Sequence, residues 1–527
     1  MGLDRLFENF ENVATPEECS LTGSVPTWLQ GTMVRNGPGM FNIGDTDFKH
    51  WFDGFAYIQR YHFEDGKMFY SARYLEGEDY KDCMRANRII TGSFGTPAFP
   101  DPCRTIFQRL ASYFTTDTKR LDNCNVAFVT NGDAVYALTE GPYMLRVDLD
   151  NLDCLEKVDL RDHLKQSVHS NTAHFHSDKD GNLYNIGSIL GQSYVFIKTV
   201  NPLTAEDVSS DHSFEKSEVL ASIPATDRWA PGYYHSFGIT DSFFILFESP
   251  LRISLQKLIK MKVVTMAFHD CMYWDEKVGV NVIIFDRIRR KRLETKVTSD
   301  AFFTFHHANS YEKDGYLVLD YAKILNPGNL DDLLLEHMRT GAFRSKNSGF
   351  KPYIHRMIIP LSVSDDSEPG DNLLANCEFA RDCKAVLRDD GSIHCTDMRI
   401  CDVSMEFPRY CYDLNMQDYR YVYGSVLFHE ESEKPGIVKV DLKEGNHEVW
   451  YKDSADELCG EPILVNRPDY TEEDEGVLIV PVVTTREGES PYVVVIDAAT
   501  MKEQGRFDIP QSRIPLGFHS HYTSRRQ

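Results

Sequence analysis

Short apolar runs separated by polar turn residues recur along almost the whole chain, and this pattern predicts β-strands joined by tight turns. Asp-Gly pairs stand between such runs, where both central positions of a type I′ hairpin turn need positive φ. These pairs lie at residues 65–66, 180–181, 314–315 and 390–391. A second, looser repeat is an apolar strand that runs into an aspartate and then a polar turn. It ends at Asp148, Asp286, Asp441 and Asp497.

The hairpins continue without a Gly-rich or Pro-rich linker that would divide the chain. A length of 527 residues allows two to four ordinary domains or one large closed β architecture. Many antiparallel hairpins in one chain fit a single propeller better than a string of sandwiches. We therefore expect residues 1–527 to form one propeller domain.

Two segments break the β pattern and predict helices. In residues 102–115, apolar side chains between Ile106 and Phe114 recur at helical spacing. In residues 251–264, Leu251, Leu255 and Leu258 do the same, interleaved with arginine and lysine. Such a helix either packs on the body of the protein or lies in one membrane leaflet, with its lysines near anionic head groups. Membrane contact near both segments is the functional interpretation.

Charge and cysteine usage narrow the class of protein. The 56 basic and 80 acidic residues give a net charge of −24, so we expect no nucleic-acid partner, because non-specific binding to phosphates needs basic surface. The twelve cysteines are scattered and form no C-x-x-C pair that would indicate zinc. The start lacks a signal-peptide pattern, Leu6 does not fit a myristoylation signal, and no apolar run is long enough to span a bilayer. These features predict a cytoplasmic location.

Four short apolar or aromatic segments, each resembling a strand, end on a histidine: His174, His235, His306 and His519. A single histidine in such a setting is usually a core residue. The first three are 61 and 71 residues apart, about one propeller blade plus an insertion loop. Successive blades can then each project one imidazole toward a common axis. The neighbours His176, His307 and His521 compete for this role, and alternation along a strand lets only one of His306 and His307 face the axis.

Motifs in a fixed order connect these histidines to a known family. They are 35–39 (RNGPG), 50–54 (HWFDG), 94–96 (FGT), 100–103 (PDPC), 234–238 (YHSFG), 305–309 (FHHAN), 461–463 (EPI), 472–477 (EEDEGV) and 518–519 (FH). With them, from about Leu21 to His519, the chain resembles the animal carotenoid cleavage oxygenases. That group includes β-carotene oxygenases, the insect carotenoid isomerooxygenase and the retinoid isomerohydrolase of the eye.

The resemblance implies a fold and a metal site. The fold would be an all-β, seven-bladed propeller, capped by a dome of helices and loops over an iron centre. Position in the family motifs selects His174, His235, His306 and His519 as ligands of iron(II). The same matching makes Glu140, Glu406 and Glu461 the carboxylates that anchor three of the ligands, and leaves His174 without an anchor. Neutral imidazoles suit ferrous iron, and a carboxylate on the other ring nitrogen fixes the tautomer.

The implied reaction is oxidative cleavage of a conjugated double bond of a carotenoid by dioxygen. We expect the central 15,15′ bond and retinal-type aldehydes as products, with trans-to-cis isomerisation, as in the insect enzyme, left open. Three alternatives remain: eccentric 9′,10′ cleavage, isomerohydrolase action on retinyl esters, and a non-catalytic carotenoid-binding propeller. Such an enzyme would take its substrate from a membrane surface as a peripheral protein. The oligomeric state stays open.

Departures from the isomerohydrolase pattern favour an oxygenase. Cys103 matches one of the membrane-anchoring cysteines associated with the isomerohydrolase, but Ala225 stands at a second such position. Residues 320–322 (DYA) replace a later cysteine pair.

Overall fold

The computed structural model describes residues 3–103, 121–261, 263–341, 351–427, 429 and 433–524. Strands dominate these ranges, and the helices between them are short. The predicted helix at 102–115 falls almost wholly on residues 104–120, outside the described ranges.

Seven sheets contain four or more strands among the described residues. Two sheets join strands from both ends of the chain. The first orders β1 (Val13–Glu18), β8 (Lys67–Tyr74), β7 (Phe55–Glu64), β3 (Gly31–Arg35) and β40 (Ser520–Thr523), with β4 (Pro38–Met40) on β7. The second orders β2 (Ser20–Gly23), β39 (Glu503–Asp508), β38 (Tyr492–Asp497), β37 (Gly476–Thr484) and β35 (Glu457–Cys459), with β36 (Ile463–Asn466) on β37.

Four sheets are antiparallel and draw their strands from one part of the chain. One orders β12 (Cys154–Asp159), β11 (Tyr143–Val147), β10 (Ala134–Leu138) and β9 (Ala127–Asn131). The next orders β13 (Ser170–Asn171), β15 (Leu183–Ile189), β16 (Ser193–Thr199) and β17 (Ser217–Pro224), with β14 (His176–Ser177) on β15. Two more order β25 (His307–Lys313), β26 (Tyr316–Lys323), β27 (Tyr353–Pro360) and β30 (Met398–Ser404), then β31 (Glu406–Arg409), β32 (Tyr421–Ser425), β33 (Pro435–Asp441) and β34 (His447–Tyr451).

The remaining large sheet is not a purely antiparallel blade. It orders β18 (Gly238–Ile239), β19 (Phe243–Glu248), β22 (Val280–Asp286), β24 (Val297–Ser299), β29 (Ile393–Thr396) and β28 (Lys384–Leu387), with β23 (Lys291–Arg292) on β22. Its β24 and β29 pair in parallel because the β28–β29 hairpin joins the outer edge from a distant part of the chain. The all-β propeller is therefore confirmed, but the predicted count of seven blades is wrong: six of the large sheets are purely antiparallel blades, and the remaining one is mixed.

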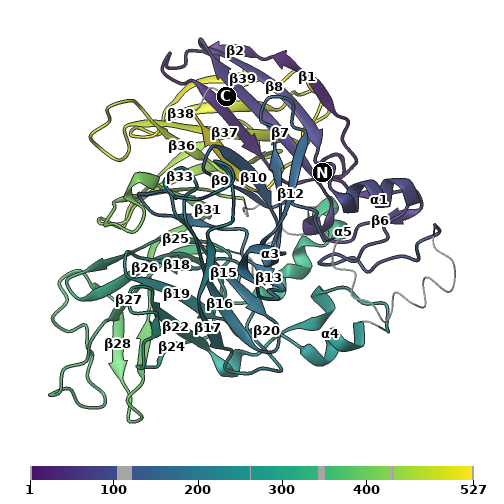
Figure 1. Cartoon of the computed structure of the whole chain (residues 1–527). Helices are drawn as coiled ribbons and strands as arrows, with labels where there is room; N and C mark the ends of the chain where they lie inside the picture. The colour runs from purple at the N-terminus through teal and green to yellow at the C-terminus, as the bar shows by residue number, and fades with distance from the viewer. Residues whose placement is uncertain are drawn as a thin grey trace.

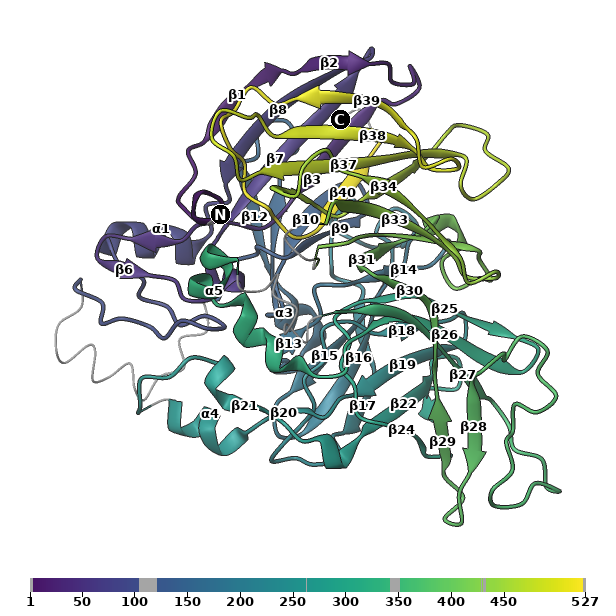
Figure 2. The same cartoon turned by 180° about the vertical axis from the view of Figure 1, so that it is seen from behind.

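The termini close the ring of sheets. Strand β40 pairs with β3, and β2 pairs with β39, so each of two sheets holds strands from both ends of the sequence. Figure 1 shows purple and yellow strands side by side at the top of the molecule, and Figure 2 shows the same arrangement from behind.

The helices and two small hairpins gather mainly on one side of the sheets. The helices are α1 (Glu78–Ala86), α3 (Leu160–Leu164), α4 (Leu255–Met261) and α5 (Leu335–Thr340), with 3-10 turns η1 (Asp4–Leu6), η2 (Trp51–Asp53), η4 (His269–Cys271), η5 (Glu276–Val278), η6 (Pro327–Leu333) and η8 (Tyr412–Leu414). The hairpins are β5 (Asn42–Ile43) with β6 (Thr46–Asp47), and β20 (Leu251–Ile253) with β21 (Met272–Trp274). In Figure 1, α1, α4 and α5 lie together on the right of the sheets.

The four predicted Asp-Gly turns fall into two groups, which differ in the φ angle of the aspartate. At Asp65-Gly66 and Asp314-Gly315 both residues have positive φ, and the flanking strands pair directly, so these turns have the predicted conformation. At residues 180–181 and 390–391 only the glycine has positive φ. There the chain forms longer loops, closed by Asp178 N donating to Asn182 O and by Arg388 N donating to Ser392 O.

The repeated aspartate at strand ends has a physical cause. Asp148, Asp286, Asp441 and Asp497 each follow or end a strand, and one carboxylate oxygen of each accepts a backbone N–H two or three residues later. An aspartate that accepts such bonds imposes the turn that follows. The loose sequence repeat therefore reflects one type of turn, which occurs in four sheets.

The predicted helix over 251–264 is wrong in its first part. Leu251 lies in β20, which pairs with β21, and the helix α4 covers only Leu255–Met261. Leu251 and Ile253 are buried, so their apolar character serves this hairpin and not one face of a helix. Among the residues that the structure covers, no helix is long and apolar enough to cross a membrane.

Candidate metal centre

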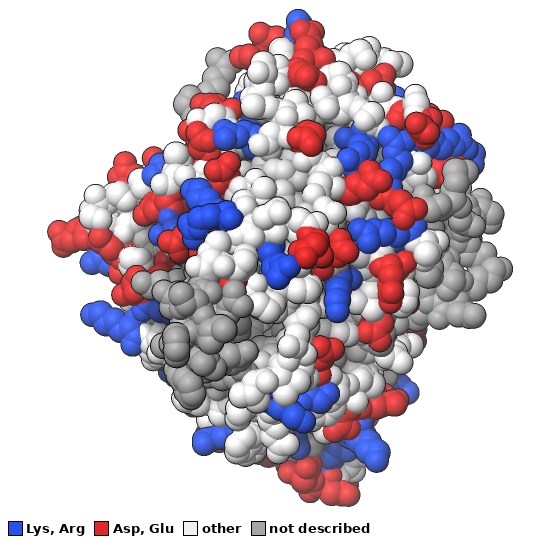
Figure 3. Space-filling model, turned by 90° about the vertical axis from the view of Figure 1, so that its right-hand side faces the viewer, with Lys and Arg blue, Asp and Glu red and all other residues white. Residues whose placement is uncertain are grey.

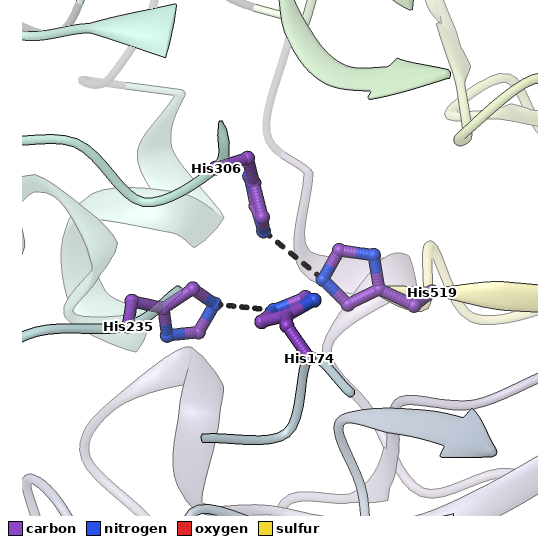
Figure 4. Close-up of side chains that lie close together, drawn as sticks. All are labelled: His174, His235, His306 and His519. Carbon is purple, nitrogen blue, oxygen red and sulfur yellow. Dashed lines mark hydrogen bonds between the residues drawn. The ribbon is translucent and has the colours of Figure 1, made fainter. Parts of the chain in front are cut away.

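Each of the four predicted histidines stands just before an inner strand or in a break within one. His174 lies between β13 and β14, and His235 precedes β18. His306 and His519 come directly before β25 and β40. Four different sheets thus deliver one imidazole each, and the candidate ligand atoms all lie within 4.8 Å of one another. Figure 4 shows the four rings converging on a common point.

The nitrogen atoms have the separation that a shared ion requires. The Nε2 atoms of His174 and His235 are 2.9 Å apart, and those of His306 and His519 are 3.1 Å apart. Two imidazole nitrogens bound at about 2.1 Å and at right angles to each other lie about 3 Å apart. The cluster therefore has the dimensions of a transition-metal site.

The outer ring nitrogens fix the tautomers of three of these histidines. Nδ1 of His235 lies 2.6 Å from Glu140, Nδ1 of His306 lies 2.6 Å from Glu406, and Nδ1 of His519 lies 2.9 Å from Glu461. A carboxylate accepts, so in the neutral rings Nδ1 carries the proton and Nε2 carries a lone pair. The Nε2 lone pairs of His306 and His519 then face each other. This arrangement is stable when a cation sits between them.

Burial keeps the imidazoles in the neutral form that binds metals. Burial lowers the pKa of His174, and the three neighbouring histidines lower it further. Burial likewise lowers the pKa of His306, and it lowers the pKa of His519 to about 4 even though Glu461 opposes the shift. Neutral imidazole is the metal-binding form, so these rings need not lose a proton near pH 7.

The three predicted carboxylates have different surroundings. Glu140 also accepts from the Tyr233 hydroxyl at 2.8 Å and is partly exposed. Glu406 accepts from Phe407 N at 2.7 Å, and its other oxygen is buried without a partner in the covered ranges. Glu461 accepts two bonds from Arg409 at 2.9 and 3.0 Å and one from Ser520 N at 2.6 Å.

All seven predicted site residues thus come together, and the competing histidines point elsewhere. Nε2 of His176 contacts Phe237 O, Nδ1 of His307 contacts Ser236 Oγ, and Nε2 of His521 contacts Thr130 Oγ1. In the described part of the chain, no hydrogen bond joins Nδ1 of His174 to a carboxylate.

Two partners of the site were missed from the sequence. Arg409 belongs to the same short motif as Glu406 but pairs with Glu461, and Tyr233 stands two residues before His235. An arginine three residues after a site glutamate can be noticed in the sequence. Which carboxylate it contacts, however, depends on the fold.

A large apolar cavity opens beside the cluster. Its volume is about 1090 Å³, and three of the histidines (His235, His306 and His519) lie in its wall with Glu140 and Glu406. The wall also contains many aromatic side chains, among them Trp51, Phe52, Phe94, Phe305, Phe407 and Phe518. A cavity of this kind suits a long hydrocarbon ligand and excludes water around it.

The fold and the site together describe a β-propeller with a four-histidine cluster beside an apolar cavity, as expected for a metal-binding propeller. Comparisons with known proteins identify its family. The family model described as retinal pigment epithelial membrane protein, RPE65, matches residues 6–524. The chain therefore belongs to the RPE65 family of carotenoid oxygenases.

Relatives and solved structures support this assignment over the whole length. The β,β-carotene 15,15′-dioxygenase of Gallus gallus is 34% identical over 503 residues, covering 94% of each chain. The mitochondrial carotenoid-cleaving dioxygenase of Homo sapiens is 32% identical over 510 residues, covering 94% of this chain and 86% of that protein. The structure of cobalt-substituted Synechocystis ACO superposes with a TM-score of 0.75 at 20% identity, covering 98% of both chains, and so supports the fold.

Proposed function

We propose that this protein is an iron(II)-dependent dioxygenase that cleaves the central 15,15′ double bond of a carotenoid to give retinal-type aldehydes. The observation that carries the proposal is the convergence of four histidines, three of which lie in the wall of a large apolar cavity. The names of the relatives support the reaction, because the Gallus gallus protein is a β,β-carotene 15,15′-dioxygenase.

The donor set fits ferrous iron. His174, His235, His306 and His519 would hold the ion, and four neutral ligands leave its charge uncompensated and up to two positions open. When bound, iron(II) supplies the binding and activation of dioxygen. Glu140, Glu406 and Glu461 hold the protons on the outer nitrogens of three rings, so that the inner lone pairs stay aimed at one point.

The chain's own contribution to catalysis is positioning. A polyene offers many similar double bonds, and the wall decides which one lies beside the histidines. Phe305 packs edge-on against His235 at 5.2 Å, and Phe407 packs against His519 at the same distance between ring centres. These rings hold the imidazoles from the cavity side and exclude water from the site.

We further propose that residues 1–527 act as one unit and that α4 with the following loop contacts a membrane surface. Leu258, Met261 and Val263 line the cavity, so this segment forms part of its edge. Ile259 is 62% exposed and Val263 is 75% exposed. On this side of the molecule, charged side chains of both signs are scattered among uncharged surface (Figure 3). Peripheral attachment of a cytoplasmic protein at this edge would let a carotenoid pass directly from lipid into the cavity.

Liposome binding tests the membrane contact. The double variant Ile259→Asp with Val263→Asp should release the protein from phosphatidylserine-containing liposomes in a flotation assay, because two charges would have to enter the apolar leaflet. The matched control is Ile288→Asp, which alters a 72% exposed apolar residue in the turn between β22 and β23. Equal binding by wild type and the double variant would refute the contact.

The second candidate is cleavage at another double bond, such as 9′,10′. The carotenoid-cleaving dioxygenase of Homo sapiens is 32% identical to this chain, against 34% for the Gallus gallus protein, but its name specifies no bond, so central cleavage stays the first candidate. Isomerisation, action on retinyl esters and a non-catalytic role have no comparable support.

Product analysis distinguishes these functions. Iron-loaded protein is incubated with β-carotene in detergent, with and without oxygen, and the products are separated by chromatography. We expect oxygen-dependent retinal as the main product. Longer apocarotenals would establish the second candidate, a cis product would add isomerisation, and no oxygen-dependent product would refute both cleavage reactions.

A further inference from the structure

One residue in the cavity wall has a backbone conformation that its side chain disfavours. Phe407, in the short strand β31, has a φ of 55°. A bulky residue with positive φ is an outlier, and a residue that precedes a proline, as Phe407 does, normally adopts an extended conformation. Among the non-glycine residues with positive φ in the described ranges, Phe407 is the one aromatic residue and the one that lies within a strand. Its conformation therefore requires an explanation.

The conformation belongs to a β-bulge between β31 and β32. Two residues of β31, Phe407 and Pro408, oppose the single residue Gly424 of β32. A Cβ on Gly424 would lie 2.8 Å from Glu406 O, so the glycine leaves room for the bulge. One common type of bulge has a left-handed residue at its first position, and this residue is glycine because glycine adopts positive φ without strain. A phenylalanine at this position indicates that its ring is needed there.

The bulge by itself does not explain the phenylalanine. It lets Glu406 and Arg409, three positions apart, both reach the metal cluster, whereas such residues face opposite sides of a regular strand. Glu406 accepts from His306, and Arg409 donates to Glu461. Glycine at position 407 would serve this arrangement with less strain. The reason for the ring must therefore lie in what the ring contacts.

The ring of Phe407 contacts two of the candidate metal ligands and also faces the cavity. Its centre lies 5.5 Å from that of His306 and 5.2 Å from that of His519. The residue lines the cavity, although only 9% of it is exposed. A polyene that reaches these two histidines from the cavity therefore passes beside this ring.

We propose that Phe407 is a specificity-determining residue: its ring, held in place by the bulge, limits how a polyene lies beside the metal centre and so selects the double bond that is cleaved. The inference rests on the proposed carotenoid cleavage and adds the residue that sets the site of cleavage. A displacement of about 1 Å at a reacting centre can cost about 100-fold in rate, so a ring fixed by the backbone suits this selection.

Product analysis with β-carotene tests the role of the ring. Phe407→Ala removes the ring and frees space beside the histidines, so we expect the ratio of longer apocarotenals to retinal to rise at least about tenfold. Phe407→Tyr keeps the ring and should keep the wild-type ratio. Chromatography of the products of the iron-loaded proteins measures the ratio. An unchanged ratio in Phe407→Ala would overturn the proposal.

Phe268→Ala is the matched control. Phe268 also lines the cavity, but its described ring contact is with Phe94 at 6.2 Å and not with a histidine of the cluster. Its φ of −63° is ordinary. This variant removes the same ring from another part of the wall and should leave the product ratio unchanged. An equal change in both variants would show that the volume of the cavity, and not Phe407, selects the bond.

Urea unfolding of the same proteins tests the strained backbone. Glycine adopts positive φ without strain, so Phe407→Gly should unfold at a higher urea concentration than Phe407→Ala. At Phe268 the order should be reversed, because glycine costs more conformational entropy than alanine where φ is ordinary. A midpoint for Phe407→Gly at or below that of Phe407→Ala would contradict the strain on which the proposal rests.

The outcomes separate this inference from the proposed function. A wild type that mainly yields apocarotenals would refute central cleavage, and the change of ratio in Phe407→Ala would still decide the inference. If wild type cleaves no carotenoid, the proposed function fails, and binding of β-carotene to the metal-free protein decides the inference. This binding, followed by quenching of tryptophan fluorescence, should weaken about tenfold in Phe407→Ala and stay unchanged in Phe407→Tyr. Equal binding by wild type and Phe407→Ala would overturn the inference.

Discussion

Glu406 and Glu461 hold equivalent places beside two of the histidines, yet their surroundings differ in charge. Both are buried, and each accepts the Nδ1 proton of one ring. Glu461 also faces the Arg409 guanidinium through two hydrogen bonds, whereas no hydrogen bond or ion pair with a lysine or arginine is described for Glu406. Burial raises the pKa of Glu406 to about 7, while Arg409 and His519 hold the pKa of Glu461 well below its usual range.

The comparison shows that two glutamates can accept the Nδ1 proton of a histidine in the same way although the charges around them differ. Glu461 is ionised at any ordinary pH, so it anchors His519 permanently. Glu406 has a costly charge that a bound cation would offset, so His306 and the metal stabilise each other. We infer that Glu461 and His519 hold their positions in the metal-free protein. The pair of Glu406 and His306 becomes stable only when the metal is bound.

The largest expected effect is on the stability of the metal-free protein. Glu461→Gln keeps the size of the side chain but removes the charge facing Arg409 and the fully buried Arg35, whose pKa Glu461 helps to maintain. We expect a loss of about 3 kcal/mol in the free energy of unfolding, because breaking a buried pair leaves an uncompensated charge. Urea unfolding at pH 7.5 measures it.

Glu406→Gln is the matched variant in that experiment. It should change the free energy of unfolding by less than about 1 kcal/mol, because the charge it removes is already unfavourable. An equal loss in both variants would contradict the comparison.

The pH dependence should separate the two carboxylates next. The folded-state pKa of Glu406, about 7, exceeds its ordinary value of 4.5, so its contribution to stability is full below pH 4.5 and is lost as pH rises through 7. Between pH 5.5 and 8, wild type should lose about 2 kcal/mol relative to Glu406→Gln. The lowered pKa of Glu461 has the opposite sign: its contribution is present above pH 4.5 and is lost as pH falls. Unfolding curves of metal-free proteins across pH test this, and parallel profiles for wild type and Glu406→Gln would be inconsistent with it.

The smallest expected effect is on metal affinity. Glu406→Gln should weaken iron binding about tenfold, at the lower end of the usual cost of losing the outer partner of a ligand. Glu140→Gln should cost less than about tenfold, because the Tyr233 hydroxyl lies 3.3 Å from Nδ1 of His235 and can replace the carboxylate as acceptor. Competition with a chelator measures both affinities. A larger loss for Glu140→Gln would reverse the assigned order.

The sequence predicted the propeller class and the seven site residues because short motifs carry them. His174, His235, His306 and His519 each stand where an aromatic approach reaches an inner strand, and the structure brings them within 4.8 Å. Alternation along a strand allowed only one of His306 and His307 to face the axis, the family motif selected His306, and His307 turns to Ser236.

Other features could not be predicted because they depend on distant segments. Arg409 donates its hydrogen bonds to Glu461, 52 residues away, and not to Glu406 in its own motif. Leu251 looked helical by spacing but forms a hairpin with residues 272–274. The parallel pairing of β24 with β29 joins residues almost one hundred positions apart, and no local pattern encodes it.

Anaerobic titration of the metal-free protein with iron(II) shows whether the four histidines form a single iron site. Wild type should bind one ion per chain with high affinity. His306→Ala should bind none at the same concentrations while remaining a folded β protein by circular dichroism. The absence of stoichiometric iron in wild type, or undiminished binding by His306→Ala, would show that these histidines do not form an iron site.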